Sequence, residues 1–428
     1  MASQRNNALP GPDDVAREVL PNGIIVLARE NFASKSVVIT GSIEVGSIFE
    51  KQEKAGLSNF TASALMRGTK NRDFDTLHET LESLGANLGI GGGVHDVGFS
   101  GKSLSEDLPV LLDLLSDSLR NPTFPTDQTE RLRGELITGL KIRAQDTRSV
   151  AGDSFRKLAY PDYHPYSRRS SGTIESISGI SLAEMAEFHT KHYGPRDMII
   201  IIVGAIKAQE AIQQVKDIFG GWQNPAQPTP PELPVAPPLA ETAQESVTIP
   251  GKTQSDIILG WPGPSRFSPD FQSANLANNI LGVFGMMGRL GHSVREEQGL
   301  AYYAGSRLNG GFGQGSWSVS AGVNPANVRR AVDSIIVEIQ RIVDEPVSEE
   351  DLADNKANFT GRLPLTLESN EGVAGSILNM ETYKLGLDYL RNYATMINAI
   401  TIEQVQAAAQ NYLSPSAYAL AVAGPALD

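Results

Sequence analysis

Two side chains in the second half of the chain have the chemistry to hold a carbonyl group, Arg295 and Tyr302, which lie seven residues apart. A guanidinium can bind a carbonyl through charge-assisted hydrogen bonds, and a phenol can donate to the oxyanion that develops on it. Taken alone, the pattern indicates more readily a solvated arginine before a Gly-Leu turn and a tyrosine at a strand edge. Tyr303 is the alternative phenol if the strand register differs.

Histidine and cysteine, the common ligands of soft metals, are scarce, because the chain has six histidines and no cysteine. His189 and His192 are spaced i, i+3 at the end of a predicted helix and could supply half of a metal site. Periodicity places no carboxylate beside them, so a solvated helix C-terminus, where cationic histidine is favoured, is the preferred interpretation. His164, between prolines, is predicted to be a loop residue. The lack of cysteine excludes disulfides, thiolate metal sites and cysteine nucleophiles.

Residues 56–69, Gly-Leu-Ser-Asn-Phe-Thr-Ala-Ser-Ala-Leu-Met-Arg-Gly-Thr, predict a helix with two different faces. Apolar residues recur at helical spacing and form a face for packing: Leu57, Phe60, Ala64 and Leu65. Asn59, Ala62 and Ser63 are spaced i, i+3, i+4 and share another face. A neutral amide, a methyl group and a hydroxyl offer none of the ligands that zinc prefers.

This segment resembles the inverted zinc-binding motif of the pitrilysin and mitochondrial processing peptidase family (insulinase-like), Gly-Leu-x-His-Phe-x-Glu-His-x-Leu-x-x-Gly-Thr. All six frame residues match: Gly56, Leu57, Phe60, Leu65, Gly68 and Thr69. In active members of the family, the positions of Asn59, Ala62 and Ser63 hold two zinc-binding histidines and the glutamate that activates water. The resemblance therefore implies a zinc-motif helix without its chemistry.

Active members take a third zinc ligand from a glutamate on a later helix, which the segment 130–140 matches here. The ligand position falls on Gly139, or on Leu140 if the alignment slips by one, and neither side chain can bind a metal. Glu135 lies one turn away and has no imidazole partners. We therefore expect this chain to bind no metal; an active hydrolase that uses another metal is the least favoured interpretation.

Residues 288–302 resemble the family pattern Ser-Arg-Leu-x-x-x-x-Arg-Glu-x-x-Gly-Leu-Ala-Tyr. Arg295 and Tyr302 match the pair with which the family holds substrate against the zinc, and with this frame the binding role becomes the favoured interpretation. In two-subunit members, the zinc motif and the Arg/Tyr pair lie on separate, similarly built chains. The resemblance therefore implies a non-catalytic subunit, inactive on its own, that positions a peptide or unfolded polypeptide for a zinc-bearing homologous subunit with an intact His-x-x-Glu-His.

The alternative function is a catalytically inactive pseudo-peptidase that serves as a scaffold or chaperone. Whether the isolated subunit forms a homodimer is left open. The Gly-rich segment 310–313 could assist substrate binding, but a similar segment at 91–93 favours a structural hairpin turn in both places.

Composition places the chain among ordinary globular proteins, with 428 residues, 40% hydrophobic and 20% charged. The net charge of -13 argues against a nucleic-acid partner. No apolar run is long enough to span a membrane. Residues 1–14 are polar and predict a flexible tail rather than a signal peptide. The predicted location is the cytoplasm, although an exported protein whose signal peptide had been removed would look the same.

A proline-rich segment divides the chain into two similar parts. Residues 221–240 hold seven prolines and predict an extended linker, so we expect an N-terminal domain at 15–220 and a C-terminal domain at 241–428. Two motifs recur at one offset. A helix, a tyrosine and an apolar strand precede Gly204 and again Gly424, and a Gly-rich turn, a strand and an amphipathic helix follow residues 88 and 308. These matches indicate an internal duplication.

The order of predicted elements favours an α+β fold with two homologous domains, each a largely antiparallel sheet covered by helices on one face. In the first domain, strands are predicted at 23–27, 37–44, 94–101 and 198–203, and helices at 74–84, 104–119, 127–145, 181–191 and 209–219. In the second, strands are predicted at 316–322 and 418–423, and a helix at 326–343. The resemblance implies the LuxS/MPP-like metallopeptidase fold.

Overall fold

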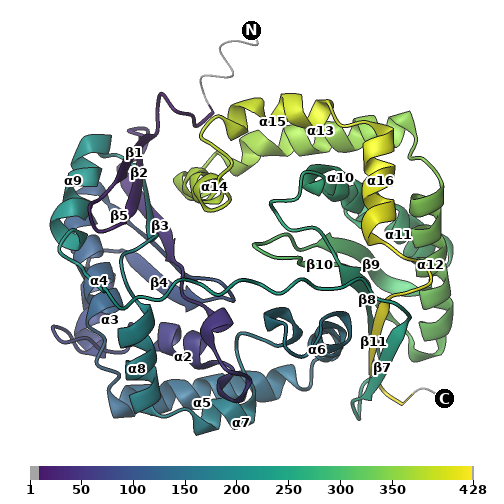
Figure 1. Ribbon diagram of the computed structural model, residues 1–428, viewed down its shortest axis with the longest axis horizontal. Coiled ribbons are helices and arrows are strands. Elements are labelled where there is room, and N and C mark those ends of the chain that lie inside the picture. Colours follow the sequence, from purple (N-terminus) through teal and green to yellow (C-terminus); the bar gives the residue numbers. More distant parts are fainter. Residues whose placement is uncertain (1–8, 427–428) are drawn as a thin grey trace. The chain divides into compact units, whose positions relative to one another are not determined.

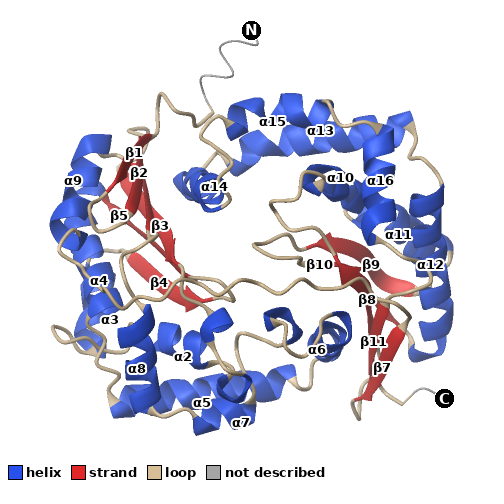
Figure 2. Ribbon diagram, in the orientation of Figure 1, coloured by secondary structure: helices blue, strands red, loops and turns tan. Residues whose placement is uncertain are grey.

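The computed structural model describes residues 9–426, and these residues fold into two compact units (Figure 1). Unit 1 comprises residues 9–139, 169–232 and 363–393, and unit 2 comprises residues 140–168, 233–362 and 394–426. Each unit is built around one β-sheet with helices packed on it, as Figure 2 shows by colour. Within the described residues, no helix is long and apolar enough to cross a bilayer.

Unit 1 contains a six-stranded sheet in the order β1-β2-β6-β3-β5-β4. Strands β2 and β6 run parallel, and all other neighbours run antiparallel. The central strand β6 is buried at every residue, because its run of isoleucines packs on both faces of the sheet. The strands are β1 (Ala16–Val19), β2 (Ile25–Glu30), β3 (Ser36–Ile43), β4 (Asn87–Gly92), β5 (Val97–Leu104) and β6 (Ile199–Gly204).

The helices of unit 1 lie mainly on one face of this sheet, where α9 packs on β1 and β2 and α4 packs on β5. The second face is covered at its centre by α14. There, Val373 and Ile377 of α14 join a core with Leu27, Ile201 and Val203 of the sheet. The helices are α2 (Leu57–Ala64), α3 (Phe74–Ser83), α4 (Leu108–Arg120), α7 (Ile174–Gly179), α8 (Leu182–His192), α9 (Ala208–Phe219) and α14 (Asn370–Thr382).

Unit 2 contains a five-stranded sheet in the order β7-β11-β8-β10-β9, in which β9 is an edge strand. Strands β7 and β11 run parallel and the other neighbours run antiparallel. The strands are β7 (Ala243–Thr248), β8 (Ser255–Pro262), β9 (Ala301–Leu308), β10 (Ser316–Val323) and β11 (Ala419–Gly424). The helices within the unit are α6 (Thr147–Ala159), α10 (Phe271–Gly282), α11 (Phe284–Leu290), α12 (Val328–Asp344) and α16 (Ile402–Tyr412).

One face of the second sheet carries α6, which packs on β8, β11 and β7. Phe155 and Ala159 of α6 lie in one core cluster with Ala419 and Ala421 of β11. The small alanine side chains let the helix approach the sheet closely. Helices α10, α12 and α16 of the same unit pack against one another (Figure 1).

The strand orders confirm the predicted duplication. Reading from β2, the first sheet runs β2-β6-β3-β5-β4, and the second runs β7-β11-β8-β10-β9 with the same parallel pair in the same place. Helix α4 follows β5 as α12 follows β10, and α8 precedes β6 as α16 precedes β11. The α+β fold with two homologous sheets is thus confirmed, with one addition: each sheet also carries a single helix on its second face.

The compact units differ from the two halves of the sequence because each unit includes one helix from the other half. Helix α6, from the first half, packs on the sheet of unit 2, and α14, from the second half, packs on the sheet of unit 1. The long helices α5 (Thr126–Arg143) and α13 (Glu349–Thr366) each precede one of them and cross a unit boundary, as does α15 (Tyr389–Asn398). Among the described residues, 221–240 form neither helix nor strand.

Three local predictions need correction. The helix predicted at 104–119 begins at Leu108, since Leu104 still belongs to β5 and Pro109 occupies the first turn of the helix. Gly91 and Gly92 lie in strand β4 rather than in a turn, whereas residues 310–313 do lie in a hairpin connection between β9 and β10. Of the predicted tail, residues 1–8 lie outside the described part, but Asp13 and Asp14 form ion pairs with Arg391 of α15.

Candidate functional site

The degenerate motif forms helix α2, whose start is held by a buried carboxylate. Gly56 precedes the helix with a φ of 94°, a conformation that favours glycine. Glu50 accepts hydrogen bonds from the backbone N–H groups of Gly56, at 3.0 Å, and Ser58. Free N–H groups at a helix start favour a negative partner. The motif frame is therefore a structural element in its own right, with or without a metal.

Asn59 and Ala62 of this helix pack against strand β4. The Asn59 side-chain amide donates to the carbonyl oxygen of Gly92 at 2.9 Å. Ala62 is 1% exposed, and a Cβ at Gly92 would lie only 3.3 Å from the Ala62 Cβ and 2.9 Å from the Asn59 Cα. Strand and helix are thus in close contact here. Asn59, Ala62 and Ser63 do not fit a zinc ion, because they supply one amide already in use, one methyl group and one hydroxyl.

The position of the third ligand is equally unsuited to a metal. Gly139 lies on an exposed part of α5, and a Cβ built on it would meet nothing within 4 Å. Glu135 forms ion pairs with Arg67, at 2.6 Å, and with Arg131. The hydrogen bond from Arg67 lowers the pKa of Glu135, which keeps the carboxylate ionised and occupied. Within residues 9–426, no three histidine, aspartate or glutamate side chains gather as metal ligands would.

The predicted solvated setting of His189 and His192 is wrong, because both rings pack among aromatic side chains. His192 is 7% exposed and lies between Phe49 and Phe188, with ring centroids 4.7 and 4.4 Å away. Its burial lowers the pKa of His192 to about 4. His189 donates from Nε2 to the Leu119 carbonyl at 2.9 Å. Helical spacing places Phe188 beside His192, but sequence periodicity could not reveal Phe49 or Leu119, which come from other segments.

His164 lies in a loop, as predicted, but it is fully buried. Its Nδ1 accepts a hydrogen bond from the backbone N–H of Tyr166 at 3.1 Å, so Nε2 carries the proton and donates to the Pro234 carbonyl at 3.0 Å. Burial lowers the pKa of this imidazole. Both nitrogens are used within the protein, which points to a structural role in holding the proline-rich segment.

The Arg/Tyr pair lies in unit 2 on two irregular elements. Arg295 belongs to the π-helical segment η5 (Gly291–Glu297), which packs against β9. Gly299, with a φ of 61°, makes the turn between them. π-Helical turns are rare and concentrate at functional sites. This segment is a second reason, besides the residue types, to regard this part of unit 2 as the candidate site.

Tyr302 is the most exposed of the large apolar side chains, with 79% of its surface accessible. Ala301 pairs with Val323 and Tyr303 pairs with Gly322, so Tyr302 is the extra residue of a β-bulge in edge strand β9. A bulge bends its strand and redirects a side chain. Among the described residues, no hydrogen bond or ion pair involves the side chains of Arg295 or Tyr302, and both are accessible to a ligand.

Tyr303, the alternative phenol, points elsewhere and is occupied. Its hydroxyl donates to the Asp256 carboxylate, and the Arg148 guanidinium lies 4.9 Å from its ring centroid. Burial and the Asp256 charge raise its pKa. Of the two tyrosines, only Tyr302, which is 79% exposed and has no hydrogen bond among the described residues, is therefore available. Sequence analysis could not settle this choice, because the bulge depends on the pairing with β10.

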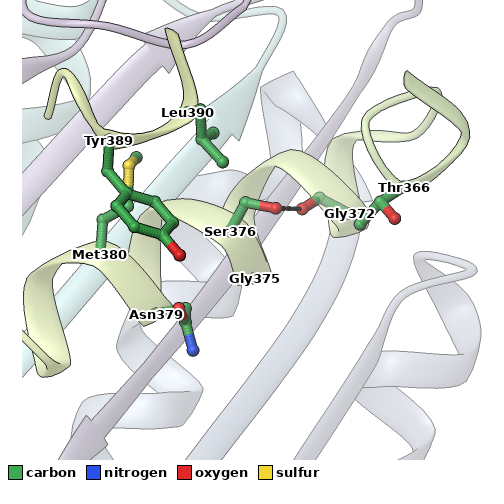
Figure 3. Close-up of a pocket in the computed structure, with 8 residues that line it drawn as sticks. All are labelled: Thr366, Gly372, Gly375, Ser376, Asn379, Met380, Tyr389 and Leu390. Atoms are coloured by element: carbon green, nitrogen blue, oxygen red, sulfur yellow. Dashed lines mark hydrogen bonds between the residues drawn. The ribbon is translucent and has the colours of Figure 1, made fainter. Parts of the chain in front are cut away.

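A separate cavity of about 330 Å³ lies on α14 and the start of α15 in unit 1 (Figure 3). Small residues line it, and the Ser376 hydroxyl donates to the Gly372 carbonyl at 2.8 Å. The Tyr389 phenol is the one titratable group of the lining. The cavity therefore lacks the paired groups that acid–base chemistry needs.

Comparison with known proteins identifies the family. Two family models match, "Insulinase (Peptidase family M16)" over residues 25–156 and "Peptidase M16 inactive domain" over residues 179–359. The chain belongs to peptidase family M16. This M16 chain is 26% identical to an uncharacterized zinc protease of Mycobacterium leprae (strain TN), over 96% of this chain and 92% of that protein.

Other relatives point to the same family. A probable mitochondrial-processing peptidase subunit beta of Arabidopsis thaliana is 25% identical over 65% of this M16 chain and 52% of its own length. The crystal structure of a peptidase M16 inactive domain from Pseudomonas fluorescens superposes with a TM-score of 0.89 at 24% identity, covering 96% of this chain and 98% of that one. This likeness confirms the fold, and the family confirms the resemblance drawn from the motifs.

Proposed function

We propose that this M16 chain is the non-catalytic subunit of a heterodimeric zinc metallopeptidase. It binds a peptide and presents it to a zinc-bearing homologous subunit, with Arg295 on the substrate carbonyl and Tyr302 on the developing oxyanion. The observation that carries the proposal is Tyr302, a phenol 79% exposed on the bulge of an edge strand, without a partner among the described side chains. An exposed tyrosine of this kind is available to a ligand.

The residues of α2 and α5 support the proposal that this chain is not catalytic by itself. Zinc would need imidazole or carboxylate ligands, and Asn59, Ala62, Ser63 and Gly139 supply neither. Relatives bear the name zinc protease, so the family membership by itself favours neither an active nor an inactive chain. The side chains at these four positions favour an inactive chain, whose partner subunit holds the zinc.

An unfolded peptide can add to the sheet of such a protein as an extra strand. Strand β9 is an edge strand of its sheet, and it carries Tyr302. Main-chain hydrogen bonds along an edge strand hold a peptide with little regard to its sequence, while the side chains decide its register. This arrangement suits a subunit that binds unfolded polypeptides.

The test combines the purified chain with a homologous subunit that carries an intact His-x-x-Glu-His, and measures cleavage of internally quenched peptides. We expect no stoichiometric zinc on this chain and no cleavage without the partner. In the mixture, Tyr302→Phe should lower kcat by about 100-fold, as for loss of one oxyanion donor. Arg295→Ala should lower kcat/KM by about 10- to 100-fold through loss of charge-assisted hydrogen bonds.

Matched controls are available in the same unit. Tyr163→Phe alters another exposed phenol, 68% accessible, and Arg329→Ala alters an exposed arginine on α12, away from the edge strand. Both should leave turnover unchanged. Normal turnover in both Arg295→Ala and Tyr302→Phe would overturn the proposal. Failure of every mixture to cleave peptide would favour the alternative, a scaffold or chaperone.

A further inference from the structure

The ring of Tyr303 lies across the neighbouring strand β10 at Gly322. In register, Gly322 pairs with Tyr303 of β9 on one side and with Asp256 of β8 on the other. A Cβ at Gly322 would lie 2.5 Å from the Tyr303 Cε1, closer than carbon atoms can approach. Glycine at this position therefore lets the phenol pass over β10 and donate to the Asp256 carboxylate two strands away.

Asp256 is a buried acceptor that ties together three elements. It is 2% exposed and also accepts hydrogen bonds from the Thr147 hydroxyl, at the start of α6, and from the Gln254 amide at 3.3 Å. The Arg148 guanidinium lies 4.9 Å from the Tyr303 ring centroid. A buried carboxylate with several donors is costly to disturb, so the Tyr303 ring is held firmly.

This latch of Tyr303, Gly322 and Asp256 coincides with the bulge that exposes Tyr302. The register changes between Gly322 and Val323, at the residue that Tyr303 covers. With the ring of Tyr303 fixed over Gly322, the preceding residue has no partner on β10 and projects from the edge strand. Without the latch, β9 is free to pair in regular register, which places Tyr302 opposite Val323 and redirects its side chain.

We propose that Tyr303, Gly322 and Asp256 are positioning residues that hold the bulge and so direct the Tyr302 phenol outward. The inference rests on the proposed function, in which Tyr302 binds the substrate oxyanion. It assigns the two consecutive tyrosines different tasks: Tyr302 contacts the substrate, and Tyr303 fixes where Tyr302 points. No other residue of β9 has a side chain anchored two strands away among the described contacts.

The first experiment reads the position of Tyr302 directly, without the partner subunit. Limited iodination of the full chain, followed by peptide mapping, measures labelling at Tyr302 and Tyr303 relative to the exposed Tyr163. In the wild-type chain, labelling should occur at Tyr302 and be at least tenfold lower at the occupied Tyr303. In Gly322→Ala, the Tyr302 to Tyr303 ratio should fall severalfold. An unchanged ratio would overturn the inference.

The second experiment measures turnover in the heterodimer as a double-mutant cycle. Tyr303→Phe keeps the ring and removes the bond to Asp256; we expect kcat to fall by about tenfold with little change in KM, since misplacement of a catalytic group acts on the chemical step. In the Tyr302→Phe background, the same change should cost less than about twofold. Asp256→Asn should behave like Tyr303→Phe. If the effects of Tyr302→Phe and Tyr303→Phe on kcat are additive, Tyr303 has only a structural role, and the inference is overturned.

Tyr160→Phe is the matched control, since the Tyr160 hydroxyl makes a comparable hydrogen bond to the Gln314 carbonyl at 3.1 Å in the same unit. It should leave the labelling ratio and the cycle unchanged. The outcomes separate the two proposals. If Tyr302→Phe itself leaves turnover normal, the proposed function fails; if it lowers turnover but Tyr303→Phe does not, the latch alone fails. Should Gly322→Ala not fold, Asp256→Asn serves the labelling experiment, because it keeps both tyrosines.

Discussion

Asn59, one of the degenerate motif positions, has a structural role in this chain. Its amide donates to the Gly92 carbonyl of β4, so this side chain joins helix to strand. The neighbouring Ala62 fills space against the same glycine. Packing and hydrogen bonding thus hold this face of the helix against the strand.

A first prediction concerns this hydrogen bond. Asn59→Ala should lower the free energy of unfolding by about 1 kcal/mol, because the Gly92 carbonyl loses its side-chain donor in a partly buried site. Ser63→Ala, on the same helix face but without a hydrogen bond among the described residues, should change stability by less than about 0.5 kcal/mol. Urea unfolding of both variants measures the difference. Equal stability of the two would contradict the assigned role of Asn59.

A second prediction at this scale is a pH dependence of stability. Burial beside Phe49 and Phe188, with Lys191 nearby, lowers the pKa of His192 to about 4 in the folded chain, against about 6.5 unfolded. The unfolded state therefore binds the proton more readily. The contribution of His192 is complete above about pH 6.5 and is lost as pH falls towards 4, by about 3 kcal/mol in all.

The measurement is urea unfolding at several pH values between 7.5 and 4, compared between wild type and His192→Phe. The phenylalanine keeps an aromatic ring in the cluster and removes the titration, so its stability should fall less on acidification. His292→Gln, at an exposed histidine, is the control and should follow the wild type. Parallel curves for wild type and His192→Phe would refute the assignment.

Among the secondary-structure elements, the contact of α2 with edge strand β4 depends on glycine. Gly92 faces the helix, and no side chain fits between them. Gly91, its neighbour in the strand, faces the other side of the sheet, where a Cβ would meet nothing within 4 Å. Because successive residues of a strand face opposite sides, Gly92 has no room for a side chain, whereas Gly91 has.

A third prediction follows from this pair. Gly92→Ala should destabilise the chain by about 2 kcal/mol or more, because its Cβ would lie 2.9 Å from the Asn59 backbone and force the helix outward. Gly91→Ala should be neutral or slightly stabilising, since it removes glycine flexibility without a clash. Thermal unfolding of the two variants gives the comparison. A tolerant Gly92→Ala would mean that β4 and α2 are not in close contact.

For the whole chain, the exchange of α6 and α14 links the two halves of the duplication. The centre of each sheet is covered on its second face by a helix from the other half. Neither half, as divided by the proline-rich segment, contains all the parts of its own core. Each compact unit therefore includes a helix from the other half of the chain.

A fourth prediction tests this interdependence. Residues 15–220 expressed alone lack α14 and should expose the apolar patch formed by Leu27, Ile201 and Val203, and so aggregate or remain partly unfolded. Co-expression with residues 241–428 should recover a soluble 1:1 complex, as measured by size-exclusion chromatography and native mass spectrometry. The control is the full chain cut at a protease site inserted in the linker. A stable, cooperatively folding 15–220 fragment would show that the exchanged helix is dispensable.

Much of the fold was predictable from sequence because its signals are local. The isoleucine run of β6 and the amphipathic pattern of α12 were found near their observed bounds, since period and composition report burial directly. The strand at Gly91 and Gly92 was missed because its side chains give no pattern. The location of the protein and the identity of its partner stay predictions, as does the absence of zinc from this chain.

The sequence by itself determined the family, because the motif frame depends on residue identity at fixed spacing. Asn59, Ala62, Ser63 and Gly139 carry none of the ligand groups that zinc prefers, whatever the fold. Only the tertiary structure decided which tyrosine is available. Tyr302 and Tyr303 are identical and adjacent, and what separates them is Gly322 and Asp256, brought beside them by strand pairing. Register, bulges and burial arise from contacts between distant segments, which local sequence does not record.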